Sequence, residues 1–246
     1  KDPLNEMVIV DGDSSLIQKY NGRALLVTTG HCAIHCRYCF RKHYPYESHS
    51  GLKRNLEAIK KMQTREDISE IILSGGDPLT LPDQILFKIF SEIKKLKHIK
   101  RMRIHSRFPV VLPSRLTFNL LKLLESQSIP IILVLHCNHP NEIDNEVAKY
   151  LKRTKMAGVT ILNQSVLLKG INDCPETLRQ LSEKLFENGA LPYYVHLLDK
   201  VSGSEHFAVS DFSAKKIQAA LYSELPAYLV PRFVKDIVGA NSKVPI

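Results

Sequence analysis

The stretch RALLVTTGHCAIHCRYCF, residues 23–40, joins a β-rich run to a cluster of cysteines. Its first seven residues are mostly aliphatic or β-branched, which is typical of a buried strand. Cys32, Cys36 and Cys39 follow within eight positions, whereas the rest of the chain has only Cys137 and Cys174. In parallel α/β folds the loops that follow strands form the active face. The sequence therefore predicts a functional loop directly after a first strand.

The alternation of strand and helix continues outward from this stretch along most of the chain. We expect strands at residues 23–29, 69–74, 101–106, 130–136, 158–165 and 191–198. Helical periodicity predicts helices at residues 52–65, 82–97, 114–126, 142–156, 175–188 and 211–222. Six βα units predict an α/β fold, a partial (β/α)6 TIM-like barrel. The segment 223–246 fits no further unit, and we expect it to close the barrel mouth.

Length and composition suit a single large core, since the chain has 246 residues and is 44% hydrophobic. We divide it into a lead-in segment (1–22), the barrel (23–222) and a C-terminal segment (223–246). The first residues lack the apolar core of a signal peptide, and no apolar run is long enough to span a membrane. The odd number of cysteines argues against a disulfide framework. We therefore expect a cytoplasmic protein without a membrane partner.

The formal net charge of +9 has two interpretations. Most basic residues are spread over predicted helix faces without an RNA-binding signature, so we expect solvated surface and no nucleic-acid partner. A few arginines could instead bind anionic small molecules inside the barrel. The net charge alone does not distinguish a solvated basic surface from an internal site for anions.

The spacing CxxxCxxC admits two kinds of metal site. Zinc would need a fourth ligand, for which His31, His35 and His43 are candidates. A structural zinc site more often uses two separated pairs of ligands, which the chain lacks. Three cysteines can instead hold three irons of a [4Fe–4S] cluster and leave the fourth iron open for a substrate.

This arrangement resembles the radical S-adenosylmethionine (SAM) enzymes, in which SAM binds the open iron. The resemblance implies a barrel of the radical SAM type. Taken alone, the segment LSGGDPL (73–79) is an ordinary turn, but its place behind a strand and after the cysteines favours a function. The implied sites are the metal ligands Cys32, Cys36 and Cys39, the adenine contact Tyr38, and Gly75, Gly76 and Asp77 at the SAM amino group, where glycine lets the backbone approach a ligand.

From Tyr20 to Lys243 the chain is similar to lysine 2,3-aminomutases, especially the branch that supplies β-lysine for modifying elongation factor P. These enzymes are isomerases that use pyridoxal 5′-phosphate (PLP) as well as SAM, and they move an amino group between neighbouring carbons through radical intermediates. The stretches that carry the resemblance are YNGRALLVTTGHCAIHCRYCFRKHYPY, HCNHPNEID, LNQSVLLKGINDC, LLDKVSGSEHF and YLVPRFVKDIVGANSKVPI.

The resemblance assigns further cofactor contacts residue by residue. Lys243 matches the lysine that holds PLP covalently, and Tyr20 and Arg23 match residues at the PLP phosphate. His136 and Gln164, each at a strand end, match residues that contact SAM. Without the resemblance, Lys243 would be interpreted as a surface lysine, whereas His136 could equally be a satisfied core or loop histidine.

Three residues account for the implied choice of substrate. Arg41 matches the arginine that pairs with the α-carboxylate of L-lysine, a natural partner for a guanidinium fork. Asp199 and Asp236 match two acids that meet the ε-ammonium, which is costly to desolvate without an opposite charge. The alternative for Asp199 is a surface ion pair with Lys200 or another lysine, which would stabilise the protein little.

The elongation-factor branch implies specific partners. These are an external electron donor and a lysyl-tRNA-synthetase-like ligase that receives (R)-β-lysine; a homo-oligomer is compatible with the resemblance. The alternatives are a catabolic lysine 2,3-aminomutase that makes (S)-β-lysine and, from another class, a zinc-binding structural or nucleic-acid module. We assign no role to His139, and we expect Cys137 and Cys174 to be small buried side chains.

Overall fold

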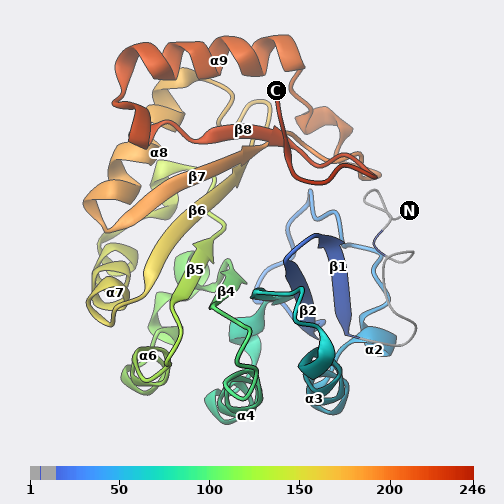
Figure 1. Cartoon of the computed structure of the whole chain (residues 1–246). Coiled ribbons are helices and arrows are strands. Elements are labelled where there is room, and N and C mark those ends of the chain that lie inside the picture. Colours follow the sequence, from blue (N-terminus) through green and yellow to red (C-terminus); the bar gives the residue numbers. More distant parts are fainter. Residues whose placement is uncertain (1–5, 7–14) are drawn as a thin grey trace.

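One curved sheet organises the molecule, and helices cover its outer face (Figure 1). The computed structural model describes residue 6 and residues 15–246. Within that part, nine strands follow one another across the sheet in chain order. They are β1 (Leu16–Tyr20), β2 (Arg23–Thr29), β3 (Glu70–Gly75), β4 (Arg101–Ser106), β5 (Ile131–Leu135), β6 (Thr160–Val166), β7 (Ala190–His196), β8 (Arg232–Lys235) and β9 (Val244–Pro245).

The sheet is an open barrel. Strands β2 to β8 pair in parallel, whereas β1 and β9 pair antiparallel at the two edges. In the described residues no ladder joins β9 to β1. The helices are α2 (Tyr46–His49), α3 (Leu52–Lys61), α4 (Asp83–Ile93), α5 (Phe108–Val111), α6 (Phe118–Glu125), α7 (Asn145–Met156), α8 (Pro175–Glu187) and α9 (Asp211–Glu224).

The predicted α/β barrel is confirmed, and all six predicted strands are present within two residues of their expected ends. The helices agree less closely: α3 and α4 each end four residues earlier than predicted, and α6 and α7 start later, where side-chain caps set the boundary. Helix α6 begins after Thr117, whose hydroxyl accepts a hydrogen bond from the Leu120 amide, and α7 begins after Asp144, which caps the Val147 amide in the same way.

The C-terminal segment does more than cover the barrel mouth. Its residues 232–235 form β8, which pairs in parallel with β7, and β9 then folds back onto β8. In Figure 1 this segment turns back toward β1 at the other edge of the sheet. The sequence did not predict β8 because a four-residue strand after Pro231 carries little periodic signal.

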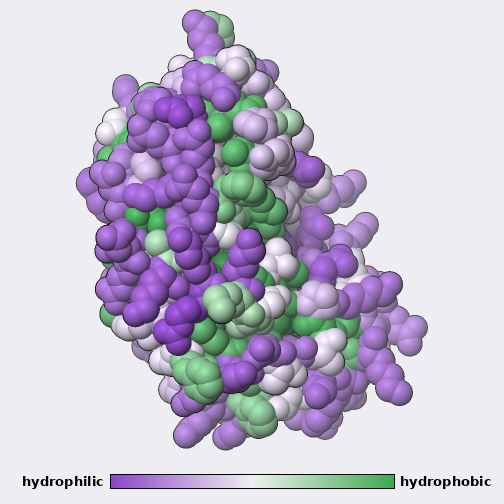
Figure 2. Space-filling view, turned by 90° about the vertical axis from the view of Figure 1, so that its left-hand side faces the viewer, coloured by the Kyte–Doolittle hydropathy of each residue, from purple (hydrophilic) through white to green (hydrophobic). Residues whose placement is uncertain are grey.

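Side chains along each strand point alternately to the helix-covered outer face of the sheet and to the interior of the barrel. On β4, Met102 and Ile104 are buried under the helices, whereas Arg103 and His105 lie on the opposite face. The apolar core therefore lies between sheet and helices, and the interior carries the polar side chains. On the outside, hydrophilic side chains cover much of the face in Figure 2. Within the described residues, no helix is long and apolar enough to cross a membrane.

Candidate active site

The loop that carries the cysteines is fastened to the end of β3. The amide of Gly76 donates to the Thr29 carbonyl at 2.7 Å, and the amide of Asp77 donates to the His31 carbonyl at 2.7 Å. A Cβ atom on Gly76 would lie 2.3 Å from the His31 carbonyl oxygen, and Gly75 has a φ of +123°. These glycines are therefore required for close packing of the chain on itself, and their approach to a ligand stays a prediction.

The Asp77 carboxylate is buried and fully engaged by the chain. It accepts hydrogen bonds from the Ser106 hydroxyl at 2.7 Å and from the amides of Leu79, Arg107 and Phe108. This carboxylate thus fixes the loops after β3 and β4 relative to each other.

The three loop cysteines are free thiols at the barrel mouth. Burial raises the pKa of Cys32 to about 11 and also raises the pKa of Cys39. No group of three or more His, Cys, Asp or Glu among the described residues is arranged around a single metal ion. Three cysteine thiols are a soft donor set that fits three irons of a [4Fe–4S] cluster, whereas zinc would need a fourth ligand.

The other two cysteines differ from each other. Cys137 is fully buried, as expected, and its Sγ lies 3.5 Å from the His139 carbonyl oxygen. Cys174 is exposed, so the prediction that it is buried was wrong. It occupies the N-cap position of α8 without capping a backbone amide, and its Sγ lies 3.0 Å from the Thr177 hydroxyl oxygen.

His136 and Gln164 come together inside the barrel, as two residues expected to share a ligand would. Nε2 of Gln164 donates to Nε2 of His136 at 2.7 Å. Burial, with the nearby charges of Arg107, Arg41 and Lys243, lowers the pKa of His136 to about 4. This imidazole is therefore neutral at physiological pH and can accept the hydrogen bond.

Asp236 is the centre of a cluster that joins the two edges of the sheet. Its carboxylate accepts hydrogen bonds from Lys19 at 2.9 Å and Tyr20 at 2.6 Å on β1, and from Lys243 at 2.5 Å just before β9. His196 on β7 lies 3.6 Å away. The structure thus brings Tyr20, Asp236 and Lys243 together, and Arg23 stacks on the Tyr20 ring with its guanidinium carbon 4.6 Å from the ring centre.

Charge and burial oppose each other in this cluster. Burial alone would raise the pKa of Asp236, but Lys243, Tyr20 and Lys19 hold it well below its usual range. Burial lowers the pKa of Lys243. Burial and the negative charge of Asp236 raise the pKa of Asp199 to about 6. The two acids therefore differ: Asp236 is ionised, and Asp199 titrates near neutrality.

Asp199 stands apart from the hydrogen bonds of the cluster. In the described part of the chain its carboxylate has no hydrogen-bond or ion-pair partner, and the alternative pair with Lys200 does not form. Asp199 is thus a half-buried acid without an ion-pair partner of its own among the described residues.

Arg41 holds a carboxylate from elsewhere in the chain. Its Nε and Nη2 donate to the two oxygens of Glu6 at 2.7 and 2.8 Å, and its Nη1 donates to the Ser74 hydroxyl at 3.0 Å. Both Arg41 and Glu6 are less than 10% exposed. The guanidinium fork is therefore oriented for bidentate recognition of a carboxylate.

The sequence reasoning missed three site residues: Lys19, Arg107 and Glu142. A β-bulge between Ile17 and Tyr20 shifts the register of β1, so Lys19 and Tyr20 both reach Asp236 although they are neighbours in the chain. Arg107 and Glu142 form an ion pair between the loops after β4 and β5. For Arg107 and Glu142, the available sequence signal was a position in the loop that follows a predicted strand.

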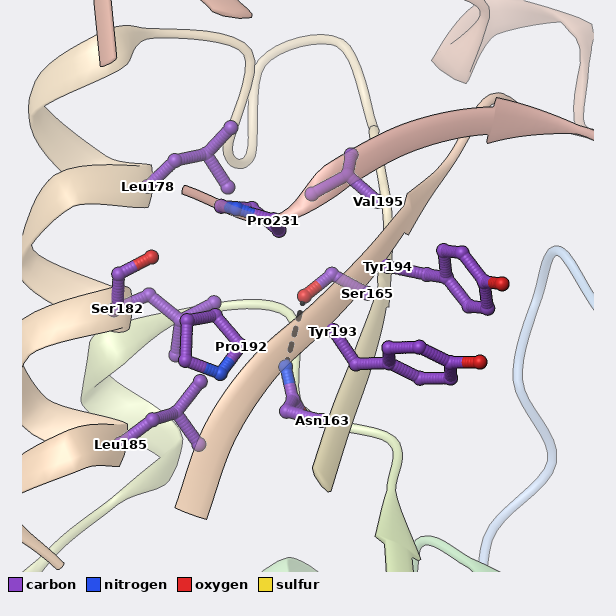
Figure 3. A pocket seen from close by; sticks show the side chains of 11 residues that line it. Asn163, Ser165, Leu178, Ser182, Leu185, Pro192, Tyr193, Tyr194, Val195 and Pro231 are labelled. Atoms are coloured by element: carbon purple, nitrogen blue, oxygen red, sulfur yellow. Dashed lines mark hydrogen bonds between the residues drawn. The ribbon is translucent and has the colours of Figure 1, made fainter. Parts of the chain in front are cut away.

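A small pocket lies away from these residues, between α8 and strands β6 and β7. Figure 3 shows Leu178, Ser182 and Leu185 of α8 facing the strands, and Asn163 donating to Ser165. None of the predicted site residues lines it. It is a packing defect under a helix, outside the barrel interior.

Comparison with known proteins identifies the class. The sequence pattern of the radical SAM superfamily matches residues 26–181, and the chain belongs to that superfamily. The fold is similar to Streptococcus suis SuiB bound to S-adenosylmethionine, with a TM-score of 0.63 at 15% identity over 88% of this chain and 51% of that one. A native anSMEcpe structure with bound AdoMet and peptide has a TM-score of 0.57 at 15% identity over 81% and 58%.

Sequence relatives narrow the family. The chain is 47% identical to the L-lysine 2,3-aminomutase of Buchnera aphidicola subsp. Baizongia pistaciae and 44% identical to that of Escherichia coli K12. Each match covers 100% of this chain and 72% or 71% of the relative. The chain therefore belongs to the L-lysine 2,3-aminomutase family and is a radical SAM isomerase. A [4Fe–4S] cluster and SAM follow from the superfamily, and PLP from the aminomutase family.

Proposed function

We propose that this enzyme moves the α-amino group of L-lysine to the neighbouring carbon and so makes β-lysine. The observation that carries the proposal is the Arg41 fork, which binds a carboxylate through two hydrogen bonds of 2.7 and 2.8 Å. A substrate α-carboxylate has the same chemistry as the side chain of Glu6. At its far end lysine carries an ammonium, for which the acids Asp199 and Asp236 are suited.

The chain's own residues fit three cofactors. Cys32, Cys36 and Cys39 would hold the cluster, with Tyr38, Gly75, Gly76, Asp77, His136 and Gln164 at SAM, and Lys243, Tyr20 and Arg23 at PLP. Bound there, the cluster and SAM supply an organic radical that removes hydrogen from the substrate, and PLP supplies a conjugated ring that stabilises the unpaired electron.

Lys243 is suited to covalent attachment because burial favours its neutral, nucleophilic form. The Asp236 carboxylate is positioned to accept a hydrogen bond from a protonated nitrogen, because its low pKa keeps it ionised. Neutral His136 can hold a polar ligand group without adding charge to the interior.

We further propose the elongation-factor branch, with (R)-β-lysine as the product, a separate ligase as its acceptor and an external electron donor. Sequence identity supports this proposal. The chain is 43–47% identical to the Buchnera, Escherichia and Haemophilus relatives but 36% identical to the Clostridium subterminale relative. The alternative is a catabolic enzyme that makes the S product.

The test is anaerobic incubation of the reconstituted enzyme with L-lysine, SAM and PLP, followed by chiral chromatography. We expect (R)-β-lysine; the S form would support the catabolic alternative, and no β-lysine from fully loaded enzyme would refute the proposed reaction. Lys243→Ala should lose the visible absorbance of protein-bound PLP, with Lys200→Ala as the control. Metal analysis showing one zinc and no iron would support the structural module instead.

A further inference from the structure

Arg107 is held rigidly at the end of β4. Its main-chain amide donates to Asp77 at 2.8 Å, and the neighbouring residues Ser106 and Phe108 bind the same carboxylate. The backbone from which the Arg107 side chain extends is therefore fixed to the loop after β3. The proposed function assigns no role to the Arg107 side chain.

The guanidinium of Arg107 connects three segments of the barrel mouth. Nη1 donates to Sγ of Cys36 at 3.8 Å and to the Tyr38 hydroxyl, and Nη2 donates to Glu142 at 2.5 Å. In the part of the chain that the structure describes, this is the one side-chain hydrogen bond from an arginine to a sulfur of the cysteine triad. The Arg107 side chain is 20% exposed, so solvent screens the charge of its guanidinium only partly.

Glu142 is equally well fixed on the far side of the guanidinium. While Oε2 accepts from Arg107, Oε1 accepts from the amides of Asn138 and His139 at 2.7 and 3.0 Å. Asn138 also donates to the Tyr38 hydroxyl. The carboxylate thus cannot easily move away from Arg107, and it offsets part of the positive charge beside Cys36.

Hydrogen bonds and positive charge at a ligating sulfur favour the reduced state of an iron–sulfur cluster, because reduction adds one negative charge. We propose that Arg107 is a positioning residue that raises the reduction potential of the cluster through Cys36, and that Glu142 moderates its effect. This inference rests on the proposed ligation of the cluster by Cys36. The step is a one-electron reduction by a low-potential donor such as dithionite, in which no bond to protein forms or breaks.

The test is a potentiometric titration of the reconstituted cluster without SAM, followed by electron paramagnetic resonance. For Arg107→Met we expect a lower midpoint potential, with the ratio of reduced to oxidised cluster falling about tenfold at a fixed solution potential, which is about 59 mV for one electron. For Glu142→Gln we expect a shift of opposite sign. The matched control is Arg37→Met, since Arg37 adjoins Cys36 in the chain but is exposed and contacts His206.

The outcomes separate a redox role from a structural one. Unchanged midpoint potentials in Arg107→Met and Glu142→Gln at native iron content would overturn the inference, as would an equal shift in Arg37→Met. If Arg107→Met fails to hold iron, Glu142→Gln alone decides, because a merely structural role predicts no rise in potential. Loss of iron in the wild type would refute the cluster proposal itself, which is a different result.

Discussion

Asp199→Asn should stabilise the cofactor-free protein at neutral and alkaline pH, although it removes a proposed substrate contact. The reason is that the Asp199 carboxylate is half-buried near the negative Asp236 and has no ion-pair partner of its own among the described residues. Asparagine keeps the shape of the side chain and removes the charge. Binding of lysine should weaken in the same variant.

The magnitude follows from the pKa of Asp199. Folding raises it from 3.8 to about 6. A shift of about two units corresponds to about 3 kcal/mol, which we reduce to about 2 kcal/mol because the side chain is part-exposed. Between these two pKa values the folded state binds more protons than the unfolded state, so wild-type stability falls as pH rises through this window. The advantage of Asp199→Asn should therefore be absent below about pH 4 and complete above about pH 7.

Denaturant unfolding of wild type and variant at pH 4, 6 and 8 measures this difference. The matched control is Asp236→Asn, which leaves two cations without their acid and should lose about 3 kcal/mol. Because the pKa of Asp236 lies well below its usual range, that loss should be constant from pH 5 to 8. If Asp199→Asn were less stable than wild type at pH 8, or its effect did not change with pH, the reasoning would be refuted.

Three further predictions concern other parts of the site. Gly76→Ala should lower cluster content after reconstitution, since its Cβ would lie 2.3 Å from the His31 carbonyl; measured iron equal to wild type would contradict this. Gln164→Leu removes the 2.7 Å hydrogen bond to His136 and should weaken SAM binding by about tenfold in calorimetry, while PLP binding stays unchanged. Arg41→Lys should weaken binding of lysine by about tenfold or more but leave 1,5-diaminopentane, which lacks a carboxylate, unaffected.

The elements that the sequence predicted well are those with strong local patterns. The strand at 23–29 and the strand at 101–106 match β2 and β4 to the residue, because alternation and flanking turns mark their ends. The short strands β1 and β9 at the two edges and β8 beside β9 were missed, because they have few residues for a periodic signal and are fixed by their neighbours.

The candidate site shows the same division. The cysteine loop could be predicted because its residues are adjacent in the chain. The contacts of Asp236 could not, because Tyr20 lies 216 residues away and the β1 bulge that directs Lys19 has no sequence signature. For Gly76, the residue type indicated a close backbone approach, and the structure shows one to the His31 carbonyl, whereas its contact with a ligand stays a prediction.

The position of Asp236 also links the site to the integrity of the fold. No backbone ladder joins β1 to β9 within the described residues, yet Lys19 and Tyr20 on β1 and Lys243 beside β9 all bind the Asp236 carboxylate. Side chains thus complete the ring that main-chain hydrogen bonds leave open. A change at Asp236 should therefore loosen the barrel mouth and weaken recognition of the ammonium at once, whereas a change at Asp199 should affect recognition without loosening the fold. Variants at Asp199 are consequently the cleaner measure of substrate choice.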